Sequence, residues 1–174
     1  MPTINGTVGH DEAAPYYFTY IDKVVGNDVI AVLEKQQEEL PKWLSSISEE
    51  QSLYRYAPDK WSLREVLNHV NDGERVFQHR AFWFARGFET PLPSFDQDLA
   101  IPNSGADKVA WSAHIEEFKS IRSATLTFFR NLPGAAWGWR GVASDNPFTV
   151  RALAYIIAGH AEHHARIIRE KYLK

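Results

Sequence analysis

Residues 149–168, TVRALAYIIAGHAEHHARII, carry the periodicity that most clearly decides the fold. Side chains suited to a core recur at alternating spacings of three and four, which predicts an amphipathic helix. Thr149 is a good N-cap residue, and the helix is expected to reach almost to the C-terminus. Two histidines take positions where leucine or isoleucine would lie in an ordinary helical bundle. The inward face comprises Val150, Leu153, Ile157, His160, His164 and Ile167.

The two inward histidines are one helical turn apart. His160 and His164 are separated by about 6 Å of helical rise and point the same way, whereas His163 lies on the flank. Burying two imidazoles without partners is costly, because each ring has two nitrogens to satisfy and two protonated rings would repel. A divalent metal ion resolves both problems, since neutral imidazole is a good ligand and a spacing of four suits chelation.

A third histidine occupies a comparable position on another predicted helix. Ser62 and Glu65 form a capping box at its start, and it should continue to about residue 86, before a glycine. Room for a metal, water or substrate would explain a glycine that costs helix propensity on its inward face. His69, His160 and His164 together would form a three-histidine site with an open position, as in catalytic metal centres. The inward face of this helix reads Val66, His69, Gly73, Val76 and Arg80.

The structural alternative is that each buried histidine simply hydrogen-bonds to a backbone carbonyl. For one inward histidine this alternative is favoured, but a same-face pair with a third histidine on another helix favours a metal. His114, on the inward face of a further helix, could be an extra ligand or a hydrogen-bond donor. His79 lies about 15 Å along the helix from His69, too far to share the ion.

Other residues are candidates for supporting roles. Asp72 could accept a hydrogen bond from the free N–H of a ligating ring. An equally favoured alternative is that Asp72 is an ordinary charged side chain in contact with solvent. Arg80 could anchor an anionic substrate or pair with Glu65 or Glu74, and the ion pair is favoured. The connection over residues 87–106 could be a lid over the site or a simple connector.

Two more helices and two long loops complete the predicted architecture. The first helix should span residues 27 or 28 to about 46, with a kink or local break at Pro41. The third should span about residues 107–131, and no stretch shows a convincing strand pattern. The connections over residues 87–106 and 132–148 are too long for adjacent antiparallel hairpins. The sequence therefore predicts an all-α four-helix bundle with long crossover connections.

Length and composition fit one soluble domain. We expect a single domain over residues 1–174, with residues 1–15 as a mobile tail. A net charge of -3 and the lack of a basic helix face argue against nucleic-acid binding. Without cysteine, the chain forms neither disulfides nor cysteine zinc sites. With no signal peptide and no run of about 20 apolar residues, the expected location is the cytoplasm, away from membranes.

Three stretches of the chain resemble the DinB superfamily, in the branch also called YfiT-like metal-dependent hydrolases. They are APDKWSLREVLNHVNDGERVFQHRAFWFARG at 57–87, TPLPSFDQD at 90–98 and TVRALAYIIAGHAEHH at 149–164. The similarity extends over nearly the whole chain, and Thr149 replaces the serine of the family motif. The resemblance implies a four-helix bundle with up-down-down-up connectivity.

The resemblance also implies a divalent metal ion, nickel or zinc, on three histidines. Carried over by motif, the ligands are His69 of LNHV and the first and last histidines of HAEHH, His160 and His164. Members include thiol S-transferases and thiol-dependent isomerases and are often dimers. A small-molecule substrate and a homodimer are therefore implied, and the superfamily name implies no DNA binding.

The leading functional hypothesis is a metal-dependent enzyme that activates a nucleophile at the three histidines. In the transferase version a low-molecular-weight thiol attacks an electrophile, and in the hydrolase version water takes its place. The transferase is favoured, because no carboxylate on the inward faces is placed as a general base. The alternative from a different class is a non-catalytic, metal-stabilised binding bundle. A ferritin-like di-iron enzyme is excluded, since the sequence contains no Glu-x-x-His motif.

Overall fold

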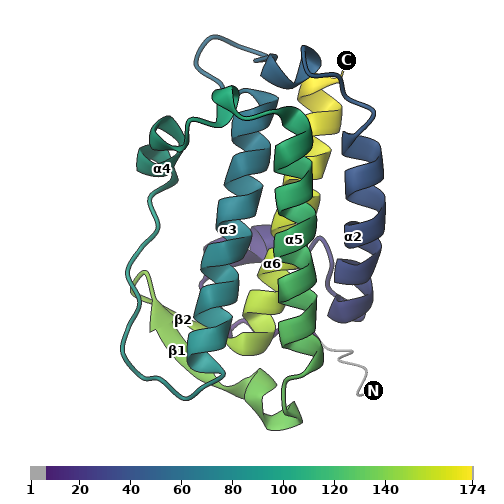
Figure 1. Cartoon of the computed structure of the whole chain (residues 1–174). Helices are drawn as coiled ribbons and strands as arrows, with labels where there is room; N and C mark the ends of the chain where they lie inside the picture. The colour runs from purple at the N-terminus through teal and green to yellow at the C-terminus, as the bar shows by residue number, and fades with distance from the viewer. Residues whose placement is uncertain (1–6, 174) are drawn as a thin grey trace.

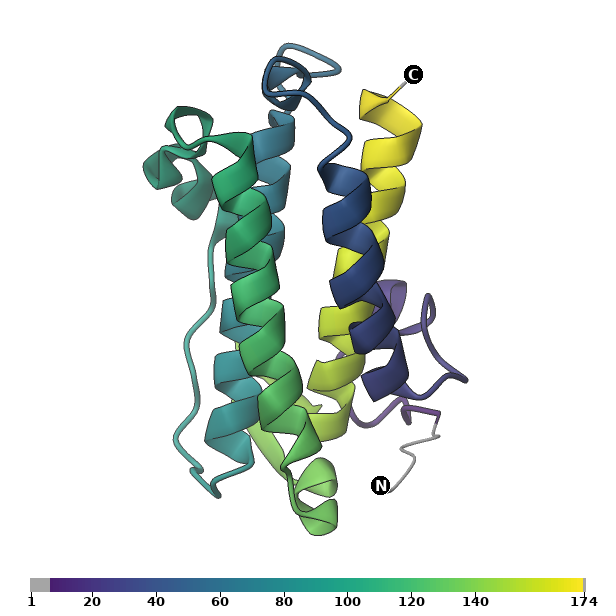
Figure 2. The ribbon, with the colours of Figure 1, turned by 45° about the vertical axis from the view of Figure 1, so that its right-hand side comes forward.

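Four long helices form the body of the protein: α2 (Val29–Leu44), α3 (Leu63–Phe84), α5 (Trp111–Arg130) and α6 (Val150–Ile167). The structure is a computed structural model and describes residues 7–173. Each long helix packs on two neighbours, in the order α2, α5, α3, α6 around the bundle. In Figure 1, α2 and α6 run upward and α3 and α5 run downward, and Figure 2 shows the same directions. The predicted four-helix bundle and its up-down-down-up connectivity are confirmed.

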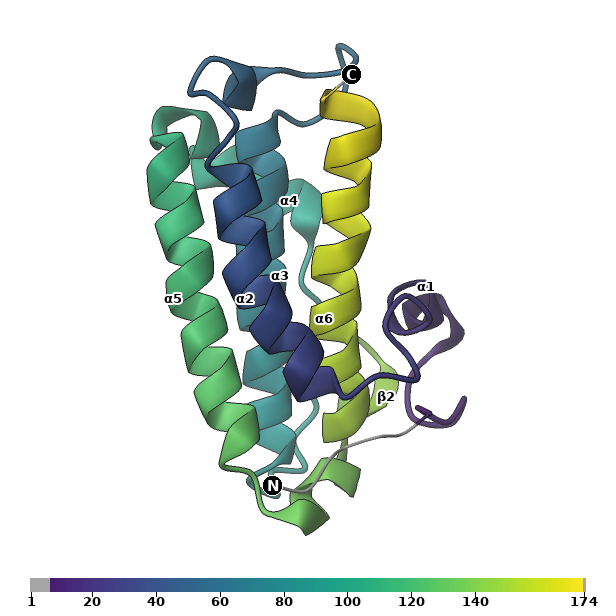
Figure 3. The same cartoon turned by 90° about the vertical axis from the view of Figure 1, so that its right-hand side faces the viewer.

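Shorter elements connect and cover these helices. Figure 3 shows α1 beside α6, outside the four-helix body. Within residues 7–173, no helix combines the length and apolar character that a membrane span requires. The shorter elements are α1 (Phe18–Ile21), α4 (Gln97–Ser104), β1 (Arg140–Ala143), β2 (Asn146–Thr149), 3-10 turns at Pro15–Tyr17, Gln51–Leu53, Ala106–Lys108 and Gly134–Gly138, and a π-helical turn at Ile168–Tyr172.

Side-chain caps fix the starts of three long helices. Asp28 accepts a hydrogen bond from the amide of residue 30 at the start of α2. Ser62 and Glu65 form the predicted capping box of α3, and Thr149 accepts from the amide of residue 152 in α6. These hydroxyl and carboxylate oxygens satisfy amides that have no partner within the helix. α2 continues through Pro41 to its end at residue 44, so the helix is not broken there.

The third long helix starts later than predicted. Asp107, the expected first residue, lies in a separate 3-10 turn, because its carboxylate accepts hydrogen bonds from Ser62 and Arg55. These contacts hold the turn against the start of α3, and α5 begins only at Trp111. The predicted loop before it also contains α4, which Asp96 caps by accepting from the amides of residues 98 and 99.

The prediction that the chain has no strands is wrong for residues 140–149. β1 and β2 pair antiparallel, and Ser144 and Asp145 form the tight turn between them with φ of 51° and 58°. Both turn residues thus adopt the left-handed conformation that a two-residue hairpin favours. Leu92 of the crossover loop adds two backbone hydrogen bonds to this hairpin, at 3.0 and 3.1 Å. Four-residue strands are too short to show the alternation by which a strand is predicted.

The N-terminal segment packs against the bundle. Val8 and Ala13 are buried, and the buried Glu12 accepts hydrogen bonds from Thr149 and Arg151. Residues 7–15 therefore contradict the prediction of a mobile tail, and residues 1–6 of that tail lie outside the described residues. These contacts place the following turn and α1 against α6.

Two hydrophobic clusters share the core, and they divide along α6. Val150 and residues 152–158 of that helix belong to one cluster, and Ala161 and Ala165 belong to the other. His160 and His164 lie at the level where the two meet. A buried ion pair between Arg122 and Glu74, with N–O distances of 2.8 Å, crosses the bundle from α5 to α3.

Candidate metal centre

Three histidines from two helices converge inside the bundle. One nitrogen from each of His69, His160 and His164 lies within 4.8 Å of the others. The Nε2 atoms of His69 and His160 are 3.0 Å apart. The His160 and His164 ring centroids are 4.6 Å apart, and each is 4.9 Å from that of His69. The structure thus brings together all three residues that the helical faces predicted.

Gly73 lets the two helices approach at this level. A Cβ atom at position 73 would lie 2.8 Å from Cε1 of His160, closer than nonbonded atoms allow. The sequence predicts that this glycine leaves room for a metal, water or substrate beside the site. The His160 ring itself fills that room, and the glycine also lines the adjacent cavity.

Burial keeps the three rings neutral. Exposed fractions are 7% for His69 and 4% for His160, and burial lowers the pKa of His69 to about 4 and of His164 to about 3. Burial is the main reason that the pKa of His160 lies well below its usual value. Electrostatic repulsion from His164 and His69 lowers this pKa further. At neutral pH each ring therefore offers an unprotonated nitrogen, which is the form that binds metal ions.

The donor set fits one divalent ion. Zn–N bonds of about 2.1 Å allow two ligand nitrogens on one ion to lie at most about 4.2 Å apart, so the 3.0 Å separation of His69 and His160 is compatible. The three nitrogens lie within 4.8 Å of one another, so binding one ion would draw the third ring inward. Three imidazoles suit zinc or nickel. His69 Nδ1 is buried and has no hydrogen-bond partner among the described residues. A cation at the facing Nε2 atoms would replace the one proton that His69 and His160 share, and His69 Nδ1 would still need a partner of its own.

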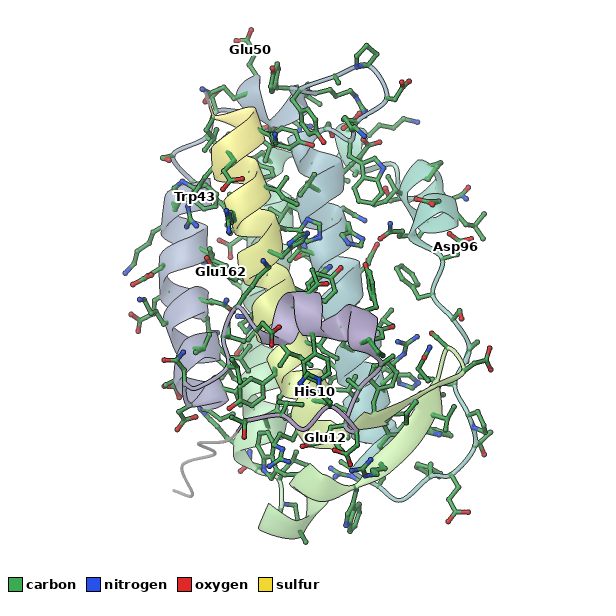
Figure 4. All side chains as sticks on the ribbon, turned by 180° about the vertical axis from the view of Figure 1, so that it is seen from behind. His10, Glu12, Trp43, Glu50, Asp96 and Glu162 are labelled. Atoms are coloured by element: carbon green, nitrogen blue, oxygen red, sulfur yellow. The ribbon has the colours of Figure 1, made fainter. Side chains whose placement is uncertain are left out.

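A cavity of about 210 Å³ opens beside the cluster. His69 and His160 form one part of its wall, and Arg80 forms another. α1 and the turn before it cover the cavity, and Figure 4 shows α1 lying across α6 and α3. No carboxylate lines this cavity within residues 7–173.

His164 opens on a second cavity, of about 240 Å³, toward the other end of α6. Asp98 of α4 and Trp61 also line it. The crossover loop thus contributes to both spaces, since Phe95 and Gln97 line the first cavity. Residues 95–98 lie beside the histidines, which favours the lid interpretation of the 87–106 connection over a simple connector.

Two predicted supporting residues lie apart from the cluster. Asp72 accepts a hydrogen bond from Asn68 at 2.8 Å and pairs with Arg75 at 3.4 Å. It does not orient His69, whose Nδ1 has no partner. His114 is buried, and its Nε2 lies 3.0 Å from a backbone carbonyl. This is the contact expected when an inward histidine has a structural role and binds no metal. His79 contacts Trp83, and His163 lies on the flank beside Tyr20, as its position predicted.

Arg80 does not form the favoured ion pair. Glu65 pairs instead with Arg55 at 2.6 Å, and Glu74 pairs with Arg122. Nη2 of Arg80 donates to the Pro93 carbonyl at 3.1 Å and to Ser144 Oγ at 2.8 Å. Arg80 also lines the first cavity, and its other interpretation, an anchor for an anionic substrate, stays a prediction.

Sequence reasoning missed most of the cavity wall. Tyr16, Tyr17 and Tyr20 lie in a segment for which no site residue was predicted, and Ser144 comes from the unpredicted hairpin turn. The aromatic composition of residues 16–20 is a signal that could have pointed to a pocket. No local signal places Ser144 there, because a contact between the hairpin and α3 brings it to the cavity.

Comparisons with known proteins agree with the fold. The sequence profile of the DinB superfamily matches residues 32–168. The solved structure of YfiT from Bacillus subtilis matches with a TM-score of 0.71 at 16% sequence identity, over 96% of this chain and 94% of that chain. That protein is described as "a probable metal-dependent hydrolase with an unusual four-helix bundle topology". No curated protein matches the sequence.

Proposed function

This chain belongs to the DinB superfamily, and on that premise we propose that it is a metal-dependent enzyme acting on a small molecule. His69, His160 and His164 would hold one zinc or nickel ion. The convergence of three neutral imidazoles from two helices, two of them buried and that of His164 half-buried, is the observation that carries the proposal. When bound, the ion supplies a Lewis acid that lowers the pKa of a thiol or a water molecule to near neutrality.

The chain's own residues define the surroundings of that chemistry. Gly73 and Phe77 hold the His160 ring from the α3 side, and Tyr20 packs edge-on against it from α1. These contacts orient one ligand and exclude water from its face. Phe95 and Gln97 close the cavity from the crossover loop. Substrate would therefore enter a pocket with the histidines in one wall.

A low-molecular-weight thiol is the favoured nucleophile. The cavity that His69 and His160 line contains no carboxylate that could take a proton from water. A thiol needs less help from a base, since its ordinary pKa of about 8.5 is far below that of water. The chain has no cysteine, so the thiol would be an external co-substrate. We therefore place S-transfer ahead of hydrolysis.

Hydrolysis is the second candidate, and Asp98 is the observation in its favour. Its carboxylate lines the cavity around His164, and its negative charge favours the protonated form of His69. An acid in that position could accept a proton from water on the His164 side. Under this alternative Asp98→Asn would abolish turnover, whereas S-transfer would survive the substitution.

Cobalt substitution tests the proposed function. The Co²⁺-loaded protein is titrated with a panel of small thiols, including 2-mercaptoethanol, and with hydroxide. The proposal predicts visible Co²⁺ bands in the wild type and a new thiolate-to-cobalt charge-transfer band on addition of thiol. His164→Ala should lose the bands, and His163→Ala, one residue away and outside the cluster, should retain them.

The rival reading is a non-catalytic bundle that the ion only stabilises. It predicts that removing the ion lowers the melting temperature and that no thiol changes the cobalt spectrum. We also propose that the protein is a homodimer of the cytoplasm, as the family resemblance implies. Light scattering at micromolar concentration tests the dimer directly.

A further inference from the structure

We propose that the cavity beside the three histidines binds a small organic carboxylate through the guanidinium of Arg80. This inference rests on the proposed function, because it names the substrate class of the same site. It is carried by a buried positive charge that has no carboxylate partner in the described part of the chain.

Arg80 is 4% exposed, yet it forms no ion pair within residues 7–173. The other well-buried arginines are paired, Arg122 with Glu74 and Arg64 with Glu49. Arg80 instead meets the carbonyl of Pro93 and the hydroxyls of Ser144 and Tyr17. A buried charge without a counter-ion is costly, so this arrangement favours the arrival of an anion.

Neighbouring groups keep the guanidinium cationic and fixed. The Phe77 and Phe148 rings lie 5.8 and 5.9 Å from its central carbon and present their faces. A cation over an aromatic face is attracted by the ring. Pro93 and Ser144 bind a single nitrogen, Nη2. Tyr17 accepts a further hydrogen bond from the guanidinium. A guanidinium has five N–H groups, so N–H groups remain for the two oxygens of a carboxylate, whose geometry matches the guanidinium fork.

The same cavity joins Arg80 to the histidines. Its wall runs along α3 from His69 through Gly73 and Val76 to Arg80. Eleven residues correspond to about 16 Å of helix, and an arginine on a helix leans toward the N-terminus, here toward the histidines. A ligand held by its carboxylate would therefore extend from Arg80 toward His69 and His160.

The remaining wall indicates an apolar or aromatic body for that ligand. Tyr16, Tyr17, Tyr20, Phe77 and Phe95 surround the space between the two ends. The volume of about 210 Å³ is smaller than the pockets that hold drug-sized molecules. These properties suit a compound with one ring or a short chain and one carboxylate.

Calorimetric titration of carboxylate and amide pairs tests the inference. Benzoate, phenylacetate and 3-phenylpropionate are titrated into the wild-type protein at pH 7, each beside its primary amide, with inorganic phosphate as a further probe. At least one carboxylate should bind about tenfold or more tightly than its amide, because charge-assisted hydrogen bonds are the strong ones. Zinc-free and zinc-loaded protein are both measured.

Variants assign the preference to Arg80. Arg80→Gln should weaken carboxylate binding about tenfold or more and leave amide binding unchanged. Arg80→Lys keeps the positive charge but loses the paired N–H groups of the guanidinium. Its affinity for the carboxylate should therefore lie between those of the wild type and Arg80→Gln. Arg75→Gln, an exposed arginine on the same helix that pairs with Glu117, is the matched control and should behave as wild type. If Arg80→Gln does not fold, the titrations of carboxylates and amides into the wild-type protein still test the proposal.

The outcomes separate this inference from the proposed function. A preference for carboxylate in protein that binds no zinc would refute the metal enzyme and leave the anion site intact. Zinc binding without any such preference would overturn the inference alone. Phosphate binding as tight as that of every carboxylate, or full carboxylate affinity in folded Arg80→Gln, would also overturn it.

Discussion

Gly73 and His160 fit together across the α3–α6 interface, and a Cβ atom at position 73 would lie 2.8 Å from His160 Cε1. The absence of a side chain on α3 therefore decides where a candidate ligand of α6 sits. The same ring has its Nε2 3.0 Å from that of His69. Adding a single carbon atom at Gly73 would consequently change the distance between His160 Nε2 and His69 Nε2.

Gly73→Ala should weaken metal binding without unfolding the bundle. The added methyl group improves helix propensity by about 1 kcal/mol but pushes the His160 ring out of place. Displacing a ligand in this way should lower zinc affinity about 10–100-fold, the range seen when groups that orient ligands are changed. Competition with a chromophoric chelator measures the affinity. Wild-type affinity in Gly73→Ala would show that the glycine does not position the ring.

Gly159→Ala should separate α1 from α6. A Cβ at position 159 would overlap the backbone carbonyl of Tyr20, which a side-chain rotation cannot relieve. We expect a loss of about 1–3 kcal/mol in unfolding free energy, the usual cost of overpacking. Urea unfolding measures the change, and Gly134→Ala, where nothing lies within 4 Å, is the matched control. Equal stability of the two variants would contradict the close packing of α1.

Glu12 should make stability depend on pH in the acidic range. Burial alone would raise its pKa, but hydrogen bonds from Arg151, the Gly9 amide and Thr149 outweigh burial and lower the pKa below 4.5. Because the folded state has the lower pKa, the stabilisation is complete above the unfolded value and is lost as the pH falls through the folded value. The unfolding free energy should therefore decline below about pH 5.

Glu12→Gln isolates that contribution. The variant should lose about 1–3 kcal/mol at pH 7, because the hydrogen bonds to a charged carboxylate disappear. Its difference from wild type should be smaller at pH 3 than at pH 7, because the wild-type carboxyl group protonates as the pH falls. Urea unfolding at both pH values measures this, with the exposed Glu50→Gln as control. A difference that stays constant with pH would contradict the charge-based account.

Zinc should raise the unfolding free energy by binding the folded state alone. At a free concentration one hundred times the Kd, linkage predicts a gain of about 2.7 kcal/mol. Thermal melts with and without a chelator measure the gain. His163→Ala should show the full gain and His164→Ala none. A gain in His164→Ala equal to that of the wild type would place the ion elsewhere.

Helical periodicity was sufficient to predict the histidine cluster. Each inward position follows from a repeat of 3.6 residues, so His69 on one helix and His160 and His164 on another had to face the core. The capping residues Ser62 and Thr149 fixed helix starts in the same local way. The bundle and its three candidate ligands therefore depend on signals contained within single helices.

Contacts between distant segments could not be predicted in this way. Arg80 was expected to pair with a glutamate on its own helix, but Glu74 is engaged by Arg122 of α5, 48 residues away. The hairpin that supplies Ser144 is held partly by Leu92 of the crossover loop. The buried position of Glu12 depends on Arg151 near the other end of the chain. These contacts depend on how distant segments pack in the tertiary structure, and the local sequence does not specify them.

In the proposed metal centre three imidazoles hold one ion, and elemental analysis of untagged protein after zinc loading and gel filtration is the sharpest test of that site. We expect one zinc per chain in the wild type and in His163→Ala. We expect no stoichiometric zinc in His69→Ala, His160→Ala or His164→Ala, each with the helical content of the wild type. A zinc-free wild type, or any of these three variants retaining one zinc per chain, would contradict the proposed site.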